Sequence, residues 1–211
     1  EALRQSVLRL EESCVPVPRL TAEVLLSRAL GQEKSFLYAH PKYELTSAEE
    51  KIWQAHIEVR CVGKPTQYIT GVQEFFGLEF RVTPDVLIPR PETELLVEEA
   101  LPMAMPGMRL LDVGTGSGCV AVAIAKHAPE VQVFASDISC SALLVAADNA
   151  QCHGARVRFF QADLLCAAKP SSFDIVVCNP PYVPLAHLGG LQRELRFEPV
   201  LALFGGENGL D

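Results

Sequence analysis

The chain has 211 residues, of which 49% are hydrophobic and 21% charged, a composition typical of a folded globular protein and not of a disordered one. No apolar run approaches the roughly eighteen residues of a membrane span, and the formal net charge of −8 is spread without the basic stripe that would attract phosphate backbones. Seven cysteines occur without a Cys-x-x-Cys pair or a histidine at ligand spacing, so we expect reduced, mostly buried thiols and no metal site.

Residues 1–70 predict a small helical bundle. In the second helix, Thr21 has the chemistry of an N-cap and Gly31 that of a stop. Two pairs have the spacing of a capping box at the start of a later helix, Thr46 with Glu49 and Ser47 with Glu50.

Residues 71–90 predict a β-hairpin that links two domains, because they are rich in aromatic and β-branched residues and punctuated by glycines. Gly77 would turn the hairpin. Pro91, followed by acidic residues, then opens a helix that runs to about residue 101.

From residue 108 the pattern changes to alternating strands and helices. Continuous apolar strands that alternate with helices predict a parallel sheet covered on both faces. The expected strands are RLLDVG, VQVFASD, VRFFQAD and FDIVVCN, and the expected helices are SGCVAVAIAKHA and SALLVAADNAQCHG, the latter with Ser139 as its cap and Gly154 as its stop.

A glycine loop, LLDVGTGSGC, joins the first of these strands to a helix. Gly114, Gly116 and Gly118 would let the backbone approach a nucleotide-like ligand beside the helix N-terminus. The order is Gly-x-Gly-x-Gly and not the Gly-x-Gly-x-x-Gly that is typical of hydride-transfer enzymes.

Three carboxylates stand at the ends of consecutive strands: Asp112, Asp137 and Asp163. A carboxylate about twenty residues after the loop can bind both ribose hydroxyls of an adenosine group, and Asp163 could take the adenine amino group. With no basic residue in the loop, this set suits S-adenosylmethionine, which carries a sulfonium cation and no phosphate. The alternative is a structural turn in another nucleotide-binding fold.

The fourth strand ends in Asn179-Pro180-Pro181-Tyr182, where sites of open α/β sheets lie. A planar NH₂ group attacks poorly unless its hydrogens are held and its lone pair is aimed at the methyl carbon. The Asn179 side-chain oxygen and the Pro180 carbonyl can be the two acceptors, since consecutive prolines hold the backbone rigidly. Tyr182 offers a flat wall for stacking; the alternative is that the prolines merely end the strand.

We nominate no general base for this chemistry, because the nitrogen becomes acidic as the methyl group arrives and solvent can take the proton. Cys178 lies in a continuous apolar strand, which favours a packing residue over a nucleophile.

Taken together, LIPRPETE, LLDVGTGSG, FASD, FDIVVCNPPYVP and RFEPVLALFGGENGLD closely resemble the HemK/PrmC family, the N5-glutamine methyltransferases of peptide chain release factors. The resemblance covers essentially the whole chain. It implies a Rossmann-like methyltransferase sheet with an N-terminal helical bundle and a β-hairpin linker. The implied domains are a substrate-recognition domain over 1–70, the linker over 71–90 and the methyltransferase domain over 91–211.

The resemblance also implies roles for single residues. The residues from Gly114 to Gly118, which include Thr115 and Ser117, would contact the donor together with Asp137 and Leu164. Residues Asn179 to Tyr182 would hold the glutamine of a Gly-Gly-Gln motif in class 1 release factors. Phe75 or Phe76 would either wall the substrate pocket or pack within the hairpin.

The family pattern continues beyond this sequence to a seven-stranded sheet, whereas four strands are expected here, so we expect the fragment alone to be poorly stable. We expect a monomer of cytoplasmic location, or a mitochondrial one if a leader precedes it, without direct contact to nucleic acid or membrane. Two alternatives stay open: an N6-adenine DNA or guanine RNA methyltransferase, and a non-catalytic binder of translation factors.

Overall fold

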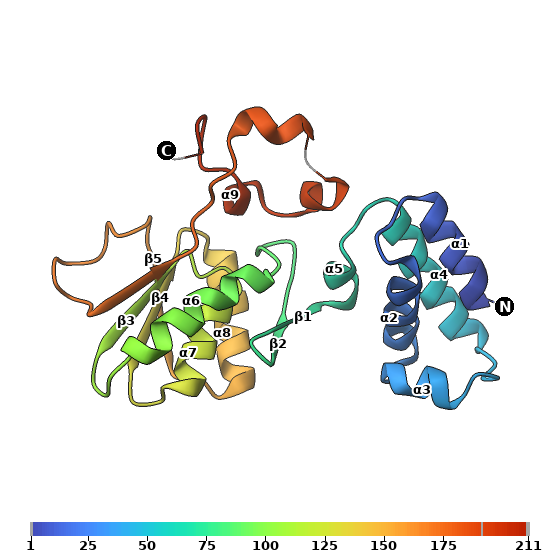
Figure 1. Cartoon of the computed structure of the whole chain (residues 1–211), viewed down its shortest axis with the longest axis horizontal. Helices are drawn as coiled ribbons and strands as arrows, with labels where there is room; N and C mark the ends of the chain where they lie inside the picture. Colours follow the sequence, from blue (N-terminus) through green and yellow to red (C-terminus); the bar gives the residue numbers. More distant parts are fainter. Residues whose placement is uncertain (1, 191, 210–211) are drawn as a thin grey trace. The chain divides into compact units, whose positions relative to one another are not determined.

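The computed structural model describes residues 2–190 and 192–209; Glu1, and Leu210 and Asp211 at the end of the expected methyltransferase domain, lie outside these ranges. The chain forms two compact units (Figure 1). The first comprises residues 1–70 together with 192–197, and the second comprises 71–191 together with 198–211. The short return of the chain to the first unit has no counterpart in the expected boundaries.

The first unit is a helical bundle around a small apolar core. Leu10, Leu25, Trp53 and Ile57 are each 0% exposed, which provides the free energy of burial that short helices need for stability. Its helices are α1 (Ala2–Glu12), α2 (Pro18–Leu30), α3 (Lys34–Ala39), α4 (Ser47–Cys61) and α5 (Thr66–Thr70), and a 3-10 helix over Arg193–Phe197 joins them from the far end of the sequence.

The helix boundaries follow the capping signals in part. Thr46 and Glu49 form the reciprocal capping box of α4, so this pair and not Ser47 with Glu50 starts the helix. Gly31 ends α2 in a left-handed conformation. The prediction that Thr21 caps α2 is wrong: the helix starts earlier, at Pro18, whose fixed φ and missing N–H suit the first turn.

The second unit begins with the predicted hairpin, β1 (Val72–Phe75) and β2 (Leu78–Arg81). Its two turn residues, Phe76 and Gly77, both have positive φ, of 51° and 70°, as the type I′ turn of a two-residue hairpin requires. Phe75 is 1% exposed and packs edge-on to Phe80, with ring centroids 6.1 Å apart. Phe76 packs against His127. Phe75 therefore packs within the hairpin, and Phe76 packs the hairpin turn against the end of α7 (Cys119–His127).

The predicted strands and helices after residue 90 are all present. The parallel sheet has the order β5-β4-β3-β6, so strand order reverses beside β3, the strand that leads into the glycine loop. The elements are α6 (Glu94–Ala100), β3 (Arg109–Val113), α7 (Cys119–His127), β4 (Gln132–Asp137), α8 (Cys140–His153), β5 (Val157–Gln161), β6 (Ile175–Cys178) and α9 (Val200–Leu203), with 3-10 helices over Pro91–Thr93, Leu101–Met103 and Leu185–Gly190.

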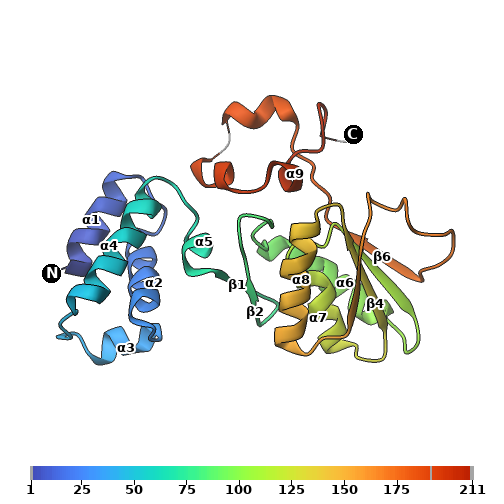
Figure 2. The same ribbon diagram turned by 180° about the vertical axis from the view of Figure 1, so that it is seen from behind.

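The sheet is not covered by helices on both faces as expected. Within the described ranges, α6, α7 and α8 pack on the same face and share one core with Leu110 and Val133 (Figure 2). Side chains of alternate register point the other way, where Phe134 lies under the Arg109 guanidinium at 5.0 Å and Val176 is 48% exposed. Period-two alternation was too weak in these apolar strands to reveal this asymmetry.

The described parts of the chain also bear on membrane-spanning helices, metal ligands and the state of the cysteines. Of the helices in the described parts of the chain, none has the length and apolar character to cross a membrane, and those parts contain no group of three His, Cys, Asp or Glu side chains arranged to hold a metal ion. All seven cysteines are free. The expectation that most are buried is wrong, because four of them are exposed: Cys14, Cys140, Cys152 and Cys166.

Candidate functional site

The glycine loop is a tight turn between β3 and α7. Gly114, Gly116 and Gly118 have φ values of 69°, 55° and 80°, which side chains other than glycine adopt at a cost. A Cβ built on Gly114 or Gly116 meets no atom within 4 Å, whereas on Gly118 it lies 3.0 Å from the Cβ of Ala146. The first two glycines therefore border open space, and the third allows α7 and α8 to approach closely.

Asp112 lies beneath the loop and not in front of it. It is 3% exposed and accepts a hydrogen bond of 2.6 Å from the Thr115 hydroxyl. Burial raises the pKa of Asp112 to about 7, because a carboxylate loses its hydration in the interior. Its contacts fix the loop from inside.

Asp137, at the end of β4, joins the loop to the start of α8. Its two carboxylate oxygens accept from the backbone N–H of Gly116 and of Ser139, both at 2.9 Å. Ser139 in turn caps α8 by accepting from the Ala142 N–H at 3.2 Å. The carboxylate is thereby held at the mouth of the loop.

The Asn-Pro-Pro-Tyr segment follows β6 and lies against a stretch from the end of the described chain. The Val183 N–H donates to the Leu203 carbonyl at 2.9 Å, and the Gly205 N–H donates to the Val183 carbonyl at 3.1 Å. A Cβ on Gly205 would lie 2.6 Å from the Pro181 carbonyl oxygen. Only glycine permits this approach, which holds the motif's backbone from one side.

Asn179 has a defined orientation. Its Nδ2 donates to the Thr93 hydroxyl at 3.2 Å, and Thr93 stands in the 3-10 helix over Pro91–Thr93. No described residue donates to the Asn179 Oδ1 or to the Pro180 carbonyl. Both acceptors are therefore available to a ligand that carries N–H groups.

These pieces enclose a cavity of about 300 Å³, which is within the range of small-molecule sites. Three acidic side chains line it, those of Asp85, Asp137 and Asp163, and no lysine or arginine does. A cationic ligand without phosphate therefore fits the cavity and a phosphate-rich one does not. Its walls are residues 85–87, the glycine loop, the ends of β4, β5 and β6, and residues 199–205. The residues present thus fit S-adenosylmethionine.

The cavity brings together most of the residues that the sequence indicated. Lining it are Gly114, Gly116, Asp137, Asp163, Leu164, Asn179, Pro180 and Pro181. The other expected residues do not line it: Asp112, Thr115 and Ser117 are buried, Gly118 packs against α8, and Tyr182 is 69% exposed. The stacking role of Tyr182 stays a prediction.

Sequence reasoning missed the opposite wall of the cavity. Glu198, 1% exposed at its side chain, accepts from the Ile88 N–H at 3.2 Å and from the Arg90 guanidinium. It thereby ties the segment that contributes Asp85 and Leu87 to the segment that contributes Pro199. These partners are more than one hundred residues apart in sequence, and no local pattern links them.

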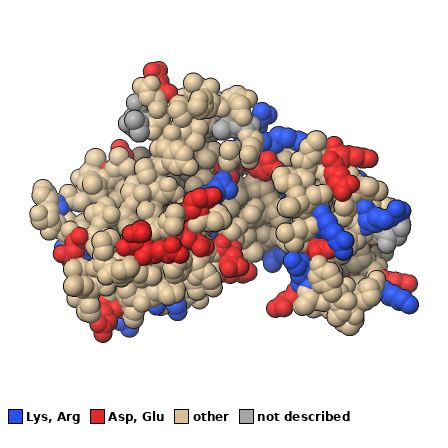
Figure 3. All heavy atoms as spheres, viewed as in Figure 1, with Lys and Arg blue, Asp and Glu red and all other residues tan. Residues whose placement is uncertain are grey.

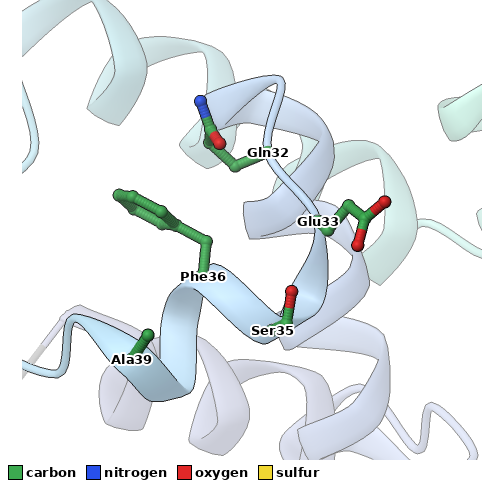
Figure 4. A pocket seen from close by; sticks show the side chains of 5 residues that line it. All are labelled: Gln32, Glu33, Ser35, Phe36 and Ala39. Carbon is green, nitrogen blue, oxygen red and sulfur yellow. The ribbon is translucent and has the colours of Figure 1, made fainter.

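The helical unit carries a second, wide-open hollow (Figure 4). It lies at the turn between α2 and α3 and is lined by Gln32, Glu33, Ser35, Phe36 and Ala39. None of the residues indicated by sequence lines it, and the five described residues that do line it are all at least partly exposed.

Comparison with known proteins agrees with this geometry. Residues 91–189 match a family model described as Methyltransferase small domain, and residues 1–71 match one described as PrmC N-terminal domain. The release factor glutamine methyltransferase of Koribacter versatilis is 46% identical over 215 residues, which cover 100% of this chain and 77% of that protein. That of Moorella thermoacetica is also 46% identical, over 100% of this chain and 76% of its own.

Among solved structures, the E. cuniculi Mtq2-Trm112 complex, responsible for methylation of the eRF1 translation termination factor, is 29% identical over 47% of this chain and 53% of its own, with a TM-score of 0.39. The sequence matches carry the assignment, since they extend through both units with high identity. This chain belongs to the release factor glutamine methyltransferase family.

Proposed function

We propose that the chain transfers a methyl group from S-adenosylmethionine to the side-chain amide nitrogen of the glutamine in the Gly-Gly-Gln motif of class 1 peptide chain release factors. The observation that carries the proposal is the meeting of Asn179 and Pro180 with Gly114 and Gly116 in one acidic cavity. Family membership over the whole chain favours this substrate.

The donor pocket in this proposal is formed by the glycine loop and by carboxylates. Gly114 and Gly116 would leave room for the ligand, Asp137 would accept from its ribose hydroxyls, and Asp163 would accept from its adenine amino group. When bound, S-adenosylmethionine supplies an electrophilic methyl group on a positively charged sulfur.

The acceptor side depends on Asn179. Because Thr93 engages the Nδ2, the Oδ1 is the atom left to accept one N–H of the glutamine amide. The Pro180 carbonyl accepts the other. Held by both hydrogens, the nitrogen presents its lone pair in one direction, and correct orientation is a large part of the acceleration available to such a reaction. Solvent takes the proton that the nitrogen loses.

The charge of the second unit disfavours a nucleic-acid substrate. On the face shown in Figure 3, acidic side chains form a band across this unit, and residues 71–107 contain seven acidic and two basic residues. A phosphate backbone would be repelled there. We therefore do not favour the DNA or RNA methyltransferase alternative.

The remaining assignments complete the proposal. We assign release-factor recognition to the helical domain over 1–70, a linking role to the hairpin over 71–90 and methyl transfer to the domain from 91 onwards. We propose that the protein acts as a monomer in the cytoplasm, and that Tyr182, although exposed, stacks on the substrate once it is bound.

Mass spectrometry of the Gly-Gly-Gln peptide tests this function directly. A class 1 release factor incubated with the chain and S-adenosylmethionine should gain one methyl group on the glutamine, and Asn179→Ala should reduce the rate by about a hundred-fold or more. Donor binding measured by calorimetry without any methyl transfer would support the non-catalytic binder instead. Transfer to RNA or DNA but not to the release factor would contradict the proposal.

A further inference from the structure

The chain makes an excursion to the helical unit shortly after the Asn-Pro-Pro-Tyr motif. Residues 192–197 belong to the first unit, although the residues before and after them belong to the second. The cavity does not account for this excursion, since none of residues 192–197 lines it. The contacts of Arg193 and Glu194 show how it is held.

Arg193 binds the ends of two helices of the bundle. Its Nη1 donates to the Ser13 carbonyl at 3.1 Å, just beyond α1, and its Nη2 donates to the Cys61 carbonyl at 3.0 Å, at the end of α4. Carbonyls at helix C-termini lack intrahelical partners and carry partial negative charge. One guanidinium satisfies both helix ends.

Glu194 makes a partly buried ion pair with the same unit. Its Oε1 accepts from Arg60 Nη2 at 2.7 Å, and the Arg60 side chain is 6% exposed. Arg60 also donates to the Lys64 carbonyl at 3.3 Å. Removing Glu194 would leave a buried guanidinium without its counter-charge, which is costly.

Gly63 makes room for this segment. A Cβ at that position would lie 3.2 Å from the Arg193 Cβ and 3.6 Å from the Phe197 ring, at a φ of +108°. The helical unit thus accommodates residues 193–197 sterically at Gly63 and binds them electrostatically through Arg60. The chain then returns to the second unit at Glu198, which is fixed by Ile88 and Arg90.

We propose that Arg193 and Glu194 are positioning residues, which fasten this segment to the helical unit and thereby order the chain that leads away from the Asn-Pro-Pro-Tyr motif. This inference rests on the proposed function. If the segment were not ordered in the free protein, it would have to become ordered when the release factor binds. Ordering a segment in advance lowers the entropy lost on binding.

Hydrogen exchange of the full chain gives a test that needs no activity. In Arg193→Ala, peptides covering residues 185–197 should exchange faster than in the parent, while those covering α7 and α8 should not change. Arg196→Ala is the matched control, because Arg196 is exposed in the same 3-10 helix and makes no ion pair with a described residue. It should exchange like the parent.

Kinetics give the second readout. Arg193→Ala should raise KM for the release factor about ten-fold or more with a smaller change in kcat, and calorimetry should find an unchanged Kd for S-adenosylmethionine, since residues 199–205 stay tied through Glu198. Arg193→Lys, which keeps one charged donor, should recover part of the loss.

Glu194→Gln keeps the proposal testable if Arg193→Ala does not fold, because it preserves shape and removes only the charge. Its exchange over residues 185–197 and its KM should change in the same direction. A folded variant of either kind with the exchange and KM of Arg196→Ala would overturn the proposal. If the parent does not methylate release factor, the proposed function fails, while the exchange data still decide whether the segment is anchored.

Discussion

At the scale of single residues, Thr93 holds the side-chain amide of Asn179 through one hydrogen bond. An asparagine amide can present either oxygen or nitrogen, and with Nδ2 donating to the Thr93 hydroxyl the Oδ1 is the atom left to accept from a ligand. Thr93→Val keeps the shape and removes the acceptor, so we expect kcat for glutamine methylation to fall about ten-fold. Thr93→Ser should retain most of the rate.

Methyl transfer to release factor under donor saturation measures this effect, with calorimetry to verify that the donor Kd is unchanged. Thr93→Val replaces the hydroxyl with a methyl group of similar size, and Thr93→Ser keeps the hydroxyl. A loss of rate in the valine variant alone therefore points to the missing hydrogen-bond acceptor. A valine variant with the parent's kcat would show that Asn179 is oriented by other contacts.

Asp112 makes stability depend on pH. Its folded pKa is about 7 against an unfolded value of 3.8, so the native state holds a proton that the unfolded chain releases between these values. Its contribution to stability is therefore fully present below about pH 4 and is lost as pH rises toward 7. The shift corresponds to about 4 kcal/mol as an upper estimate.

The variant Asp112→Asn should remove this loss while still accepting from the Thr115 hydroxyl. We expect the free energy of unfolding of the variant, relative to the parent, to rise from pH 4 to pH 7 in urea titrations. Glu99→Gln, a change at an exposed carboxyl, serves as the control and should run parallel to the parent. A constant difference between Asp112→Asn and parent would contradict the buried, protonated state.

The residues that sequence predicted at this scale are those with a local signature. The spacing of the glycines and the position of Asp137 after a strand are local patterns, and the cavity contains Gly114, Gly116 and Asp137. Thr93 and Glu198 had no such signature, because their partners lie 86 and 110 residues away. Such contacts require the fold itself.

At the scale of elements, two glycines allow two requirements for glycine to be compared: a positive φ, which both have, and close packing against a neighbouring helix, which only one has. Gly118 and Gly154 both have positive φ, at 80° and 60°. A Cβ on Gly118 would lie 3.0 Å from Ala146 Cβ and 3.2 Å from its Cα, whereas on Gly154 it meets nothing within 4 Å. Their alanine variants therefore differ mainly in packing between α7 and α8.

We expect Gly154→Ala to cost about 1 kcal/mol, the conformational term alone, and Gly118→Ala to cost about 1 to 3 kcal/mol more, because the helices must separate. Urea denaturation of the two variants gives the difference. Equal costs would mean that α8 yields without strain. Affinity for S-adenosylmethionine should fall only in Gly118→Ala. The Gly118 N–H donates to the Thr115 carbonyl within the glycine loop, whereas Gly154 lies at the C-terminal end of α8.

Helices and strands were predicted correctly where residues at their ends have clear capping or stop signals. The prediction failed for very short helices and for the covering of the sheet. Ser139 and Gly154 bound α8 as expected. The short helices α3 and α5 were missed, since each is too brief for helical periodicity to be recognised. The covering of one face of the sheet was missed because parallel strands are apolar on both sides.

At the scale of the whole molecule, the two units have separate cores. Trp53 is the single tryptophan of the chain and is 0% exposed in the core of the helical unit. The cavity at the glycine loop is lined entirely by residues of the second unit. The sequence motifs indicated two domains, but not the return of residues 192–197, because a charged hexapeptide carries no periodic signal.

This arrangement lets one ligand and one fluorophore report on different units. S-adenosylmethionine at a hundred times its Kd should stabilise the second unit by about 2.7 kcal/mol, which hydrogen exchange in α7 and α8 would measure. Urea unfolding followed by Trp53 fluorescence should shift much less, because no residue that lines this cavity belongs to the bundle core. Equal shifts by both probes would mean that the units unfold as one, so that donor occupancy is transmitted to the bundle.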